Sequence, residues 1–218
     1  IMFEELDKYN LKNKDDTIST IVLGKGTYVY NDKIPYDIVG DRMVPINEIV
    51  IRGQITFARP GRRARLKHLT IENKIGTGVL INPSSVLIAE DVVIRHCGTN
   101  GVFLSSGATL ECKNVEVRYC GESGMVLQDG AILTLGGKTN VHHNNCKGSV
   151  LQYGDVYHNN CKDFSDHYGL QVYIGKVRVK LIDGLTLEKV FHDNGCGNNW
   201  NSRATQALER ANPKVYKG

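Results

Sequence analysis

The chain repeats itself between residues 69 and 148 with a short, nearly constant period. When it is broken before Leu69, Val92, Val115 and Thr139, four lines align at spacings of 23, 23 and 24 residues. The third position of each line is aliphatic and the tenth is glycine. These residues are Ile71, Ile94, Val117 and Val141, and Gly78, Gly101, Gly124 and Gly148. Self-similarity at a fixed short period indicates a repeat architecture.

The composition of each line favours strands over helices. Each contains short apolar runs separated by turn residues, which is typical of three short strands per repeat. A helix pair would need more than about 30 residues, and valine, isoleucine and threonine dominate here. We therefore expect each line to form one coil of a parallel β-solenoid, with the third position as an inward column. We expect glycine at the tenth position because its backbone adopts positive φ.

The segment 94–131, IRHCGTNGVFLSSGATLECKNVEVRYCGESGMVLQDGA, resembles the right-handed parallel β-helix of the pectin-lyase-like superfamily. It is similar in particular to the non-catalytic repeats of carbohydrate-binding and F-box-associated β-helix proteins. The resemblance implies an all-β, right-handed, single-stranded parallel β-helix of about seven or eight coils. We expect a capping segment at 1–18, the β-helix at 19–195, and a C-terminal tail at 196–218 with a short helix.

A polar strip is expected on one lateral face. Strand side chains alternate between the two faces of a sheet, so the neighbours of the inward column point outward. The first outward column contains Arg52, Glu72, Arg95, Arg118 and His142, and the adjacent column contains Glu116. This strip is either a ligand-binding surface or a solvated face.

The resemblance implies what such a strip does. Catalytic members of the superfamily bind polysaccharide along such a face, with an arginine or lysine base and often calcium in lyases, and clustered aspartates in hydrolases. This strip has arginines but no aspartate cluster. We therefore expect a non-enzymatic protein that binds carbohydrate or a protein partner, with no cofactor and no metal.

Two other interpretations stay open. As an enzyme, the chain would be a lyase or epimerase for an acidic glycan, with Arg95, Arg118, Glu116 and His142 as its catalytic residues. Calcium would be a cofactor only in the case of a lyase. As a third interpretation, the chain is a structural module of a larger assembly, for example a viral one.

A basic segment interrupts the regular period at 55–68, ITFARPGRRARLKH. We interpret it as a basic turn or small projection. It is either a binding patch for acidic polysaccharide, phosphate or nucleic acid, through Arg62, Arg63 and Arg65, or a solvated loop. Nucleic acid is the less favoured ligand, since no aromatic platform accompanies the arginines and the net charge of the chain is only +4.

An apolar stripe is expected on another outer face. Leu80, Phe103 and Val126, followed by Val150, occupy equivalent outward positions in successive coils. Such a stripe is either covered by a terminal segment or used for association with a partner or a second copy.

Composition bounds the remaining possibilities. The six cysteines do not form the pattern of a disulfide framework and are expected to be mostly reduced. Cys97 and Cys120 are ladder-equivalent and within disulfide reach, and HHNNC and HDNGC have zinc-like spacing, but no CxxC pair accompanies them. No run of 18 apolar residues predicts a membrane span. The N-terminal residues do not form a secretion signal, which slightly favours the cytoplasm while leaving the location open.

Overall fold

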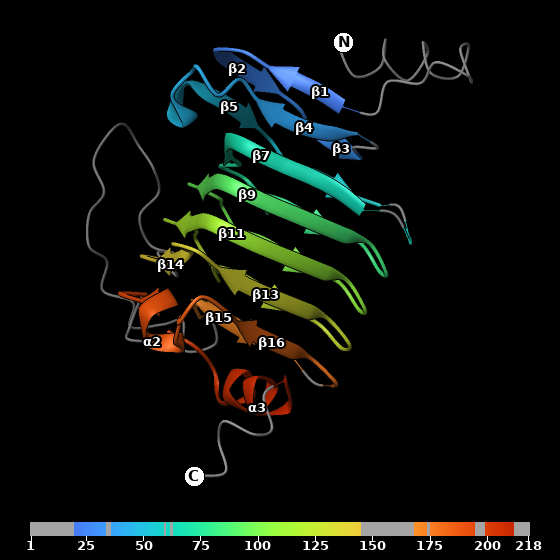
Figure 1. The fold of residues 1–218 in the computed structure, drawn as a ribbon, viewed down its shortest axis with the longest axis vertical. Helices are drawn as coiled ribbons and strands as arrows, with labels where there is room; N and C mark the ends of the chain where they lie inside the picture. The colour runs from blue at the N-terminus through green and yellow to red at the C-terminus, as the bar shows by residue number, and fades with distance from the viewer. Residues whose placement is uncertain are drawn as a thin grey trace.

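The fold was analysed in a computed structural model, which describes residues 20–33, 36–58, 60–61, 63–144, 168–173, 175–194 and 199–211. Its strands stack into a parallel β-helix whose axis is vertical in Figure 1. The predicted cap at 1–18 lies outside the described residues, as do Arg62, Gly148 and Val150. None of the described helices is long and apolar enough to span a membrane.

Each coil contributes strands to three lateral faces. The first face contains β1 (Thr20–Leu23), β4 (Asp37–Gly40), the first halves of β7 (Arg63–Glu72), β9 (Val86–Arg95) and β11 (Thr109–Arg118), then β13 (Ile132–Gly136) and β16 (Arg178–Leu181). The second face contains β2 (Gly26–Val29), β5 (Ile49–Arg52), the second halves of β7, β9 and β11, then β14 (Asn140–His142) and β17 (Phe191–His192). The third face contains β3 (Asp32–Lys33), β6 (Ile55–Phe57), β8 (Val79–Ile81), β10 (Val102–Leu104), β12 (Met125–Leu127) and β15 (Leu170–Val172).

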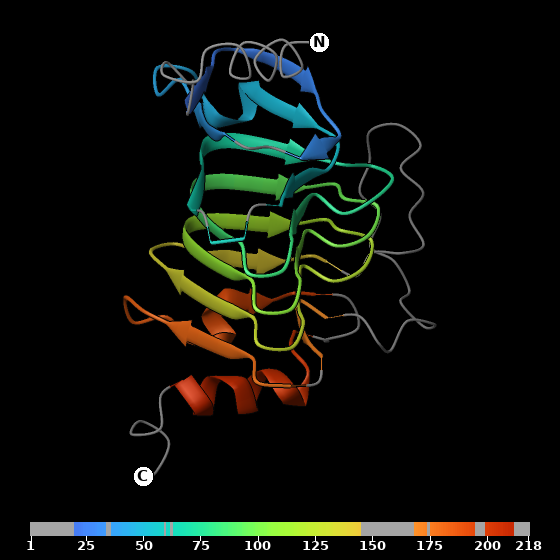
Figure 2. The same cartoon turned by 90° about the vertical axis from the view of Figure 1, so that its right-hand side faces the viewer.

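Within the described residues, three short helical elements accompany the strands. The 3₁₀ turn η1 (Ile46–Glu48) precedes β5, and α2 (Leu187–Val190) leads into β17. Helix α3 (Ser202–Ala211) packs against β15 and β16 and closes the C-terminal end of the stack (Figure 2).

A left-handed residue separates the first face from the second in successive coils. His68, Asp91 and Asn114 have φ between 51° and 55°, so the ten-residue strands β7, β9 and β11 bend there without ending. Gly137 and Asp183 follow in the same register position with φ of 64° and 56°. Asparagine, aspartate and glycine tolerate this conformation best. The bend divides each long strand between two faces.

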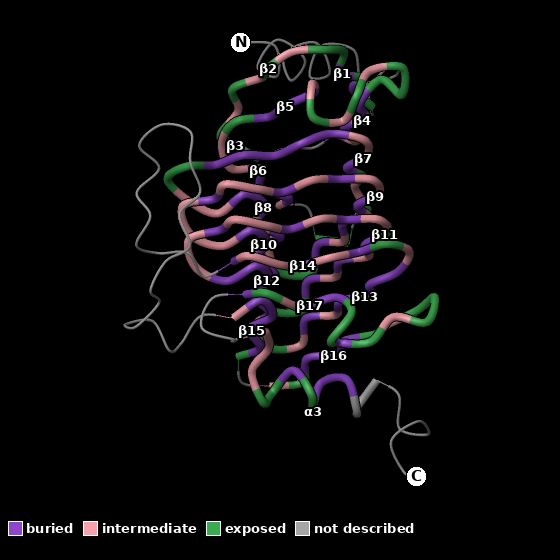
Figure 3. The backbone as a smooth tube through the Cα atoms, turned by 90° about the vertical axis from the view of Figure 1, so that its left-hand side faces the viewer, coloured by how far each residue is buried: buried purple, intermediate pink, exposed green. Residues whose placement is uncertain are grey.

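The predicted inward column is confirmed. Ile51, Ile71, Ile94, Val117, Val141 and Phe191 pair in succession along the axis. All of them are buried. Buried and less buried residues alternate along the strands (Figure 3). The 23-residue period therefore does place equivalent residues above one another.

The glycine positions have a different cause from the one predicted. Gly78, Gly101 and Gly124 are not among the described residues with positive φ. A Cβ atom on Gly101 would lie 2.4 Å from Val117 Cγ1 and 2.7 Å from the Gly124 carbonyl oxygen. Close packing against the next coil therefore excludes a side chain there.

The register after the third line also differs from the prediction. β12 pairs with β15, and Met125 N–H donates to the Gly169 carbonyl at 2.8 Å. Gly169 therefore takes the ladder place that was expected for Gly148. The described residues form a β-helix of about five turns rather than seven or eight. The last coil also differs from the earlier ones, because α2 lies between β16 and β17.

The basic segment is mostly a strand, which corrects its interpretation as a turn or projection. β7 begins at Arg63 and pairs with β4, β5 and β9 along its length. Arg63 and Arg65 consequently belong to the flat first face, on the side of the bend away from the polar strip.

Candidate functional site

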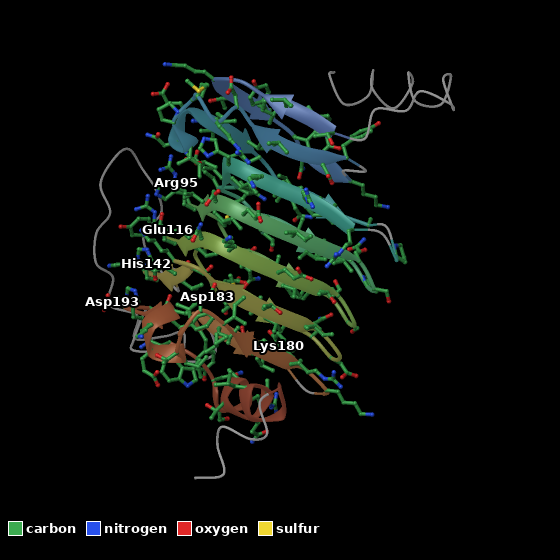
Figure 4. All side chains as sticks on the ribbon, in the orientation of Figure 1. Arg95, Glu116, His142, Lys180, Asp183 and Asp193 are labelled. Atoms are coloured by element: carbon green, nitrogen blue, oxygen red, sulfur yellow. The ribbon has the colours of Figure 1, made fainter. Side chains whose placement is uncertain are left out.

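The polar strip lies on the outer side of the second face. Its main column pairs in the predicted order, and His192 extends it: Arg52, Glu72, Arg95, Arg118, His142 and His192. Glu116 stands beside it, opposite Val93 and Asn140 in the neighbouring strands. Arg95, Glu116, His142 and Asp193 follow one another down one edge of the molecule in Figure 4.

Glu72 forms the centre of the upper part of the strip. Arg95 Nε donates to its Oε1 at 2.9 Å, and Arg52 Nε lies 3.5 Å from its Oε2. His96 Nδ1 approaches Oε1 to 3.9 Å. His96 and Arg95 outweigh the opposing effect of burial and lower the pKa of Glu72 from 4.5 to about 2. Glu72 is therefore a carboxylate held between cationic groups.

Glu116 forms the equivalent centre two coils further on. His142 Nε2 lies 3.0 Å from Glu116 Oε1, and Arg118 Nε lies 3.4 Å from the same oxygen. The latter is an ion-pair contact without hydrogen-bond geometry. His142, followed by Arg118, lowers the pKa of the Glu116 carboxyl against the effect of burial. His142 Nδ1 faces Nδ1 of His143, which completes a carboxylate–imidazole–imidazole chain.

Five rings form a continuous series beside these carboxylates, which we call the ring ladder: His96, Tyr119, His143, His142 and His192. His96 stacks on Tyr119 at 5.6 Å between centroids, and Tyr119 lies 5.5 Å from His143. His142 meets His143 edge to face at 4.8 Å and stacks on His192 at 5.4 Å. The Arg118 guanidinium lies 5.3 Å from the Tyr119 ring centroid, within cation–π range.

Backbone conformation places part of this ladder at a corner of the coil. His96, Tyr119, His143 and Asp193 all have φ between 50° and 56°. Cys97, Cys120, Asn144 and Asn194 follow them directly and are buried. Asn144 Nδ2 donates to the carbonyls of Val117 and His142 at 3.0 Å, and its Oδ1 accepts from Cys120 N–H at 3.1 Å. The asparagines thus fix the turn from which the histidine rings project.

A family model for the right handed beta helix region matches residues 46–173, which is more than half of the chain. The chain belongs to the right-handed β-helix family. This agrees with the resemblance to pectin-lyase-like proteins and with the parallel coils described above. No curated protein and no solved structure gave a match.

The β-helix places the two predicted groups of ligand-binding residues, the polar strip and the basic segment, on different lateral faces. Arg52, Glu72, Arg95, Glu116, Arg118 and His142 do lie together on the second face. Arg63 and Arg65 lie on the first face, where Arg63 Nη2 pairs with Glu111 Oε1 at 2.9 Å. They are not part of the strip.

The apolar stripe lies on the outer side of the third face of the β-helix. Leu80, Phe103 and Val126 pair in one column, as expected. The next residue in the column is Gln171 rather than Val150. Leu80 and Phe103 are partly exposed, whereas Val126 is only 2% exposed.

The cysteines of the described coils are structural. Cys97, Cys112 and Cys120 are buried thiols, and burial raises the pKa of the Cys112 thiol. Cys97 and Cys120 donate from Sγ to the carbonyls of Arg95 and Arg118. Among the described residues, no group of three or more histidine, cysteine, aspartate or glutamate side chains is arranged to hold a metal ion. Cys146, Cys161 and Cys196 lie outside the described residues.

Sequence reasoning left five residues of this site out of the predicted binding strip: His96, Tyr119, His143, His192 and Asp193. It considered His192 and Asp193 only within the zinc-like segment HDNGC. His192 Nδ1 lies 2.8 Å from Asp193 Oδ2, and His192 lowers the pKa of that carboxyl. The signal that identifies them is the likeness of FHDN at 191–194 to VHHN at 141–144, which the register of β14 with β17 bears out. The distance in sequence between these two segments differs from the regular period, so a search at a fixed period does not detect their likeness.

Proposed function

We propose that this β-helix binds a carbohydrate through the ring ladder and the polar strip without chemically changing it. The observation that carries the proposal is the unbroken contact of five partly exposed rings, beside arginine–carboxylate pairs, over successive coils. Sugar rings present apolar C–H faces that pack on aromatic rings, and hydroxyl groups that bond to charged side chains. A site of this kind combines both features.

The charge balance of the strip favours a neutral sugar. Arg52 and Arg95 both contact Glu72, and Arg118 contacts Glu116. Three arginines are thus set against two glutamates, which leaves little uncompensated positive charge. Such pairs can donate to and accept from hydroxyl groups, whereas an anionic sugar would face the two carboxylates directly.

Isothermal titration calorimetry with a panel of neutral oligosaccharides tests this proposal. We expect one of them to bind, and Tyr119→Ala to weaken that binding by about tenfold or more through loss of the central ring. Tyr119→Phe keeps the ring and should bind nearly as the parent does. Tyr173→Ala removes an exposed tyrosine on the third-face side of the coil and is the matched control. Failure of every neutral sugar to bind, or equal effects of both alanine variants, would contradict the proposal.

One observation favours a second candidate, a lyase or epimerase for an acidic glycan. The chain from Glu116 through His142 to His143 has the form of a proton relay, with the Arg118 cation beside it. An epimerase or lyase needs a base of this kind to remove a proton beside a carboxylate. Formation of unsaturated sugars from polyuronates, abolished in His142→Gln, would replace the binding proposal with this one.

A further inference from the structure

His142 and His143 face each other through the same ring nitrogen. Their Nδ1 atoms lie 2.5 Å apart, so one of the two carries a proton and the other accepts it in a hydrogen bond. The second nitrogen of His142, Nε2, lies 3.0 Å from Oε1 of Glu116. Both polar atoms of the His142 ring are therefore engaged, and its side chain is only 12% exposed.

The Glu116 carboxylate fixes one proton of this arrangement. His142, followed by Arg118, lowers the pKa of Glu116 against the effect of burial, so this carboxyl is ionised at neutral pH and only accepts. His142 Nε2 consequently donates to Glu116, whether the ring is neutral or charged. The position at which His142 can gain a proton is Nδ1, which faces His143.

The contact between the two Nδ1 atoms holds one proton and no more. With both rings neutral, His143 Nδ1 donates to His142 Nδ1, and a first added proton leaves one hydrogen bond between them. With both rings charged, each Nδ1 carries a proton, neither accepts, and two cations lie 4.8 Å apart between ring centroids. Separated rings can take two protons and paired rings only one, so a falling pH favours separation.

The charged groups around the pair add to this effect. His192 stacks on His142 at 5.4 Å, and its Nδ1 lies 2.8 Å from Asp193 Oδ2. Acid therefore gathers up to three imidazolium groups and Arg118 about two carboxylates, Glu116 and Asp193, which Figure 4 shows on either side of His142. The other titratable or charged groups of the described elements around the pair are Arg95, His96 and Tyr119 on the adjacent coils, and the exposed Glu188 and Lys189 on α2.

Separation of the rings acts on the corner that carries them. His143 has φ of 52°, a conformation that is sparsely populated outside glycine, asparagine and aspartate. Its N–H donates to the Asp193 carbonyl at 3.0 Å, and its own carbonyl accepts from Tyr119 N–H at 3.1 Å. Asn144 N–H donates to Asn194 Oδ1 at 3.0 Å. A force that moves the His143 ring therefore strains bonds to both neighbouring coils.

We propose that the His142–His143 pair is a proton-controlled switch, which stays paired with at most one positive charge and opens its corner when a second proton binds. Histidine changes charge near pH 6.5, so the opening belongs between about pH 7 and pH 5. Glu72, whose pKa is lowered to about 2, keeps its charge throughout that window. One consequence rests on the proposed function: opening moves His143 away from Tyr119 and weakens sugar binding in acid.

The test follows the protein alone by NMR, without any sugar. Long-range proton–nitrogen spectra should show both imidazoles taking up protons between pH 7 and pH 5, and the proton–proton cross-relaxation between the two rings should vanish with the second proton. The hydrogen-exchange protection factor of the Asn144 amide should fall at least about tenfold over this range, because the corner opens locally. The Val102 amide, which donates to the Gly124 carbonyl at 2.9 Å, is the reference and should change less than about twofold.

Three variants separate the pair from other titrating groups. His143→Phe keeps a ring that takes up no proton, and Tyr119 already places an aromatic ring at the equivalent corner with φ of 56°. His143→Asn is a second non-titrating variant, since asparagine tolerates positive φ. Both should keep their Asn144 protection from pH 7 to pH 5. His68→Asn removes a histidine that contacts the Val44 carbonyl, away from the pair, and should open as the parent does.

Any of four results would overturn this inference. Ring contact that persists with both histidines charged would show that the pair accommodates two protons. Absence of proton uptake by the pair above pH 5 would remove the switch from its window. Equal loss of Asn144 protection in the parent and in both His143 variants would assign the opening to another group, and equal loss at Val102 would indicate general unfolding. Because no sugar is present, this proposal and the proposed function can fail independently.

Discussion

Glu72 is a residue whose ionisation is strongly tied to the folded state. Its pKa is about 2 in the folded chain against an ordinary value of 4.5, with His96 and Arg95 as its cationic neighbours. A carboxyl with a lowered folded pKa contributes stability above its unfolded pKa, and that contribution is lost as the pH falls through the folded value. Glu72 should therefore stabilise the fold fully above about pH 4.5 and progressively less toward pH 2.

We predict that Glu72→Gln lowers the free energy of unfolding at pH 7 by about 1–3 kcal/mol, since it leaves Arg52 and Arg95 without their carboxylate. The variant should also lose less stability than the parent between pH 4.5 and pH 2. Urea denaturation across that range measures both effects. Glu111→Gln breaks the more exposed pair with Arg63 and should cost no more than about 1 kcal/mol. Parallel pH profiles for parent and Glu72→Gln would show that Glu72 is not the group responsible.

At this scale the sequence predicts which residues become neighbours, but not how their side chains pair. A strict period places Arg52, Glu72, Arg95 and Arg118 in one column because parallel strands repeat their register. The sharing of Glu72 by Arg52 and Arg95 depends on side-chain rotamers, which a period does not encode. Gly78, Gly101 and Gly124 occupy the predicted ladder positions, but the predicted cause is wrong, since the restriction at Gly101 comes from Val117 in the next coil and not from φ.

The element that positions the ring ladder is the corner held by the two buried asparagines, Asn144 and Asn194. Asn144 N–H donates to Asn194 Oδ1 at 3.0 Å, so the two corners are bonded across successive coils. Each asparagine also donates to the carbonyl two residues before it. These bonds replace the weaker thiol–carbonyl contacts of Cys97 and Cys120 in the preceding coils.

We predict that Asn144→Ala costs roughly 2–3 kcal/mol, because Cys120 N–H and the Val117 carbonyl lose their buried partner. The change should also weaken sugar binding, as His142 and His143 lose the support of the corner. Chemical denaturation and calorimetry measure the two effects. Asn140→Ala is the matched control, since Asn140 Oδ1 is buried without a hydrogen-bond partner in the described part of the chain. Equal costs for the two variants would contradict this role for Asn144.

Element boundaries were predictable wherever the period was regular. The strands at 69–72, 79–81 and their equivalents in the next two coils follow directly from it. The prediction of strand positions from the repeat failed after β14, because two segments match the repeat about equally well. One is Gly148 with the SVL that follows it, and the other is Gly169 with the LQV that follows it. The prediction was also wrong at Arg63–Lys67, where a run of cations suggested a loop and the structure has a strand. The outward-pointing side chains of an exposed strand can all be charged, so a run of cations does not exclude a strand.

At the scale of the whole molecule, the open ends of the stack are the places where a second copy can pair. An end coil presents unpaired backbone N–H and C=O groups unless another segment covers it. At the C-terminal end α3 supplies the cover. Ala204, Ala207 and Leu208 are buried on its inner side, where the helix packs against β15 and β16 (Figures 1 and 2). The small alanine side chains allow the helix to approach these strands closely.

We predict that Ala207→Glu detaches α3 and makes the protein associate end to end. Ala207 is 1% exposed, and an unpaired carboxylate cannot remain at such a position without a large desolvation cost. Movement of the helix exposes β16, whose backbone groups on the side away from β13 can pair with the same edge of a second copy. Light scattering should show a molecular mass that rises with concentration, and thermal unfolding should begin at lower temperature. Gln206→Glu places the same charge on the exposed side of the same helix and should change neither measurement. A variant that scatters like the parent at every concentration while unfolding earlier would show that α3 stabilises the last coil without protecting it from association.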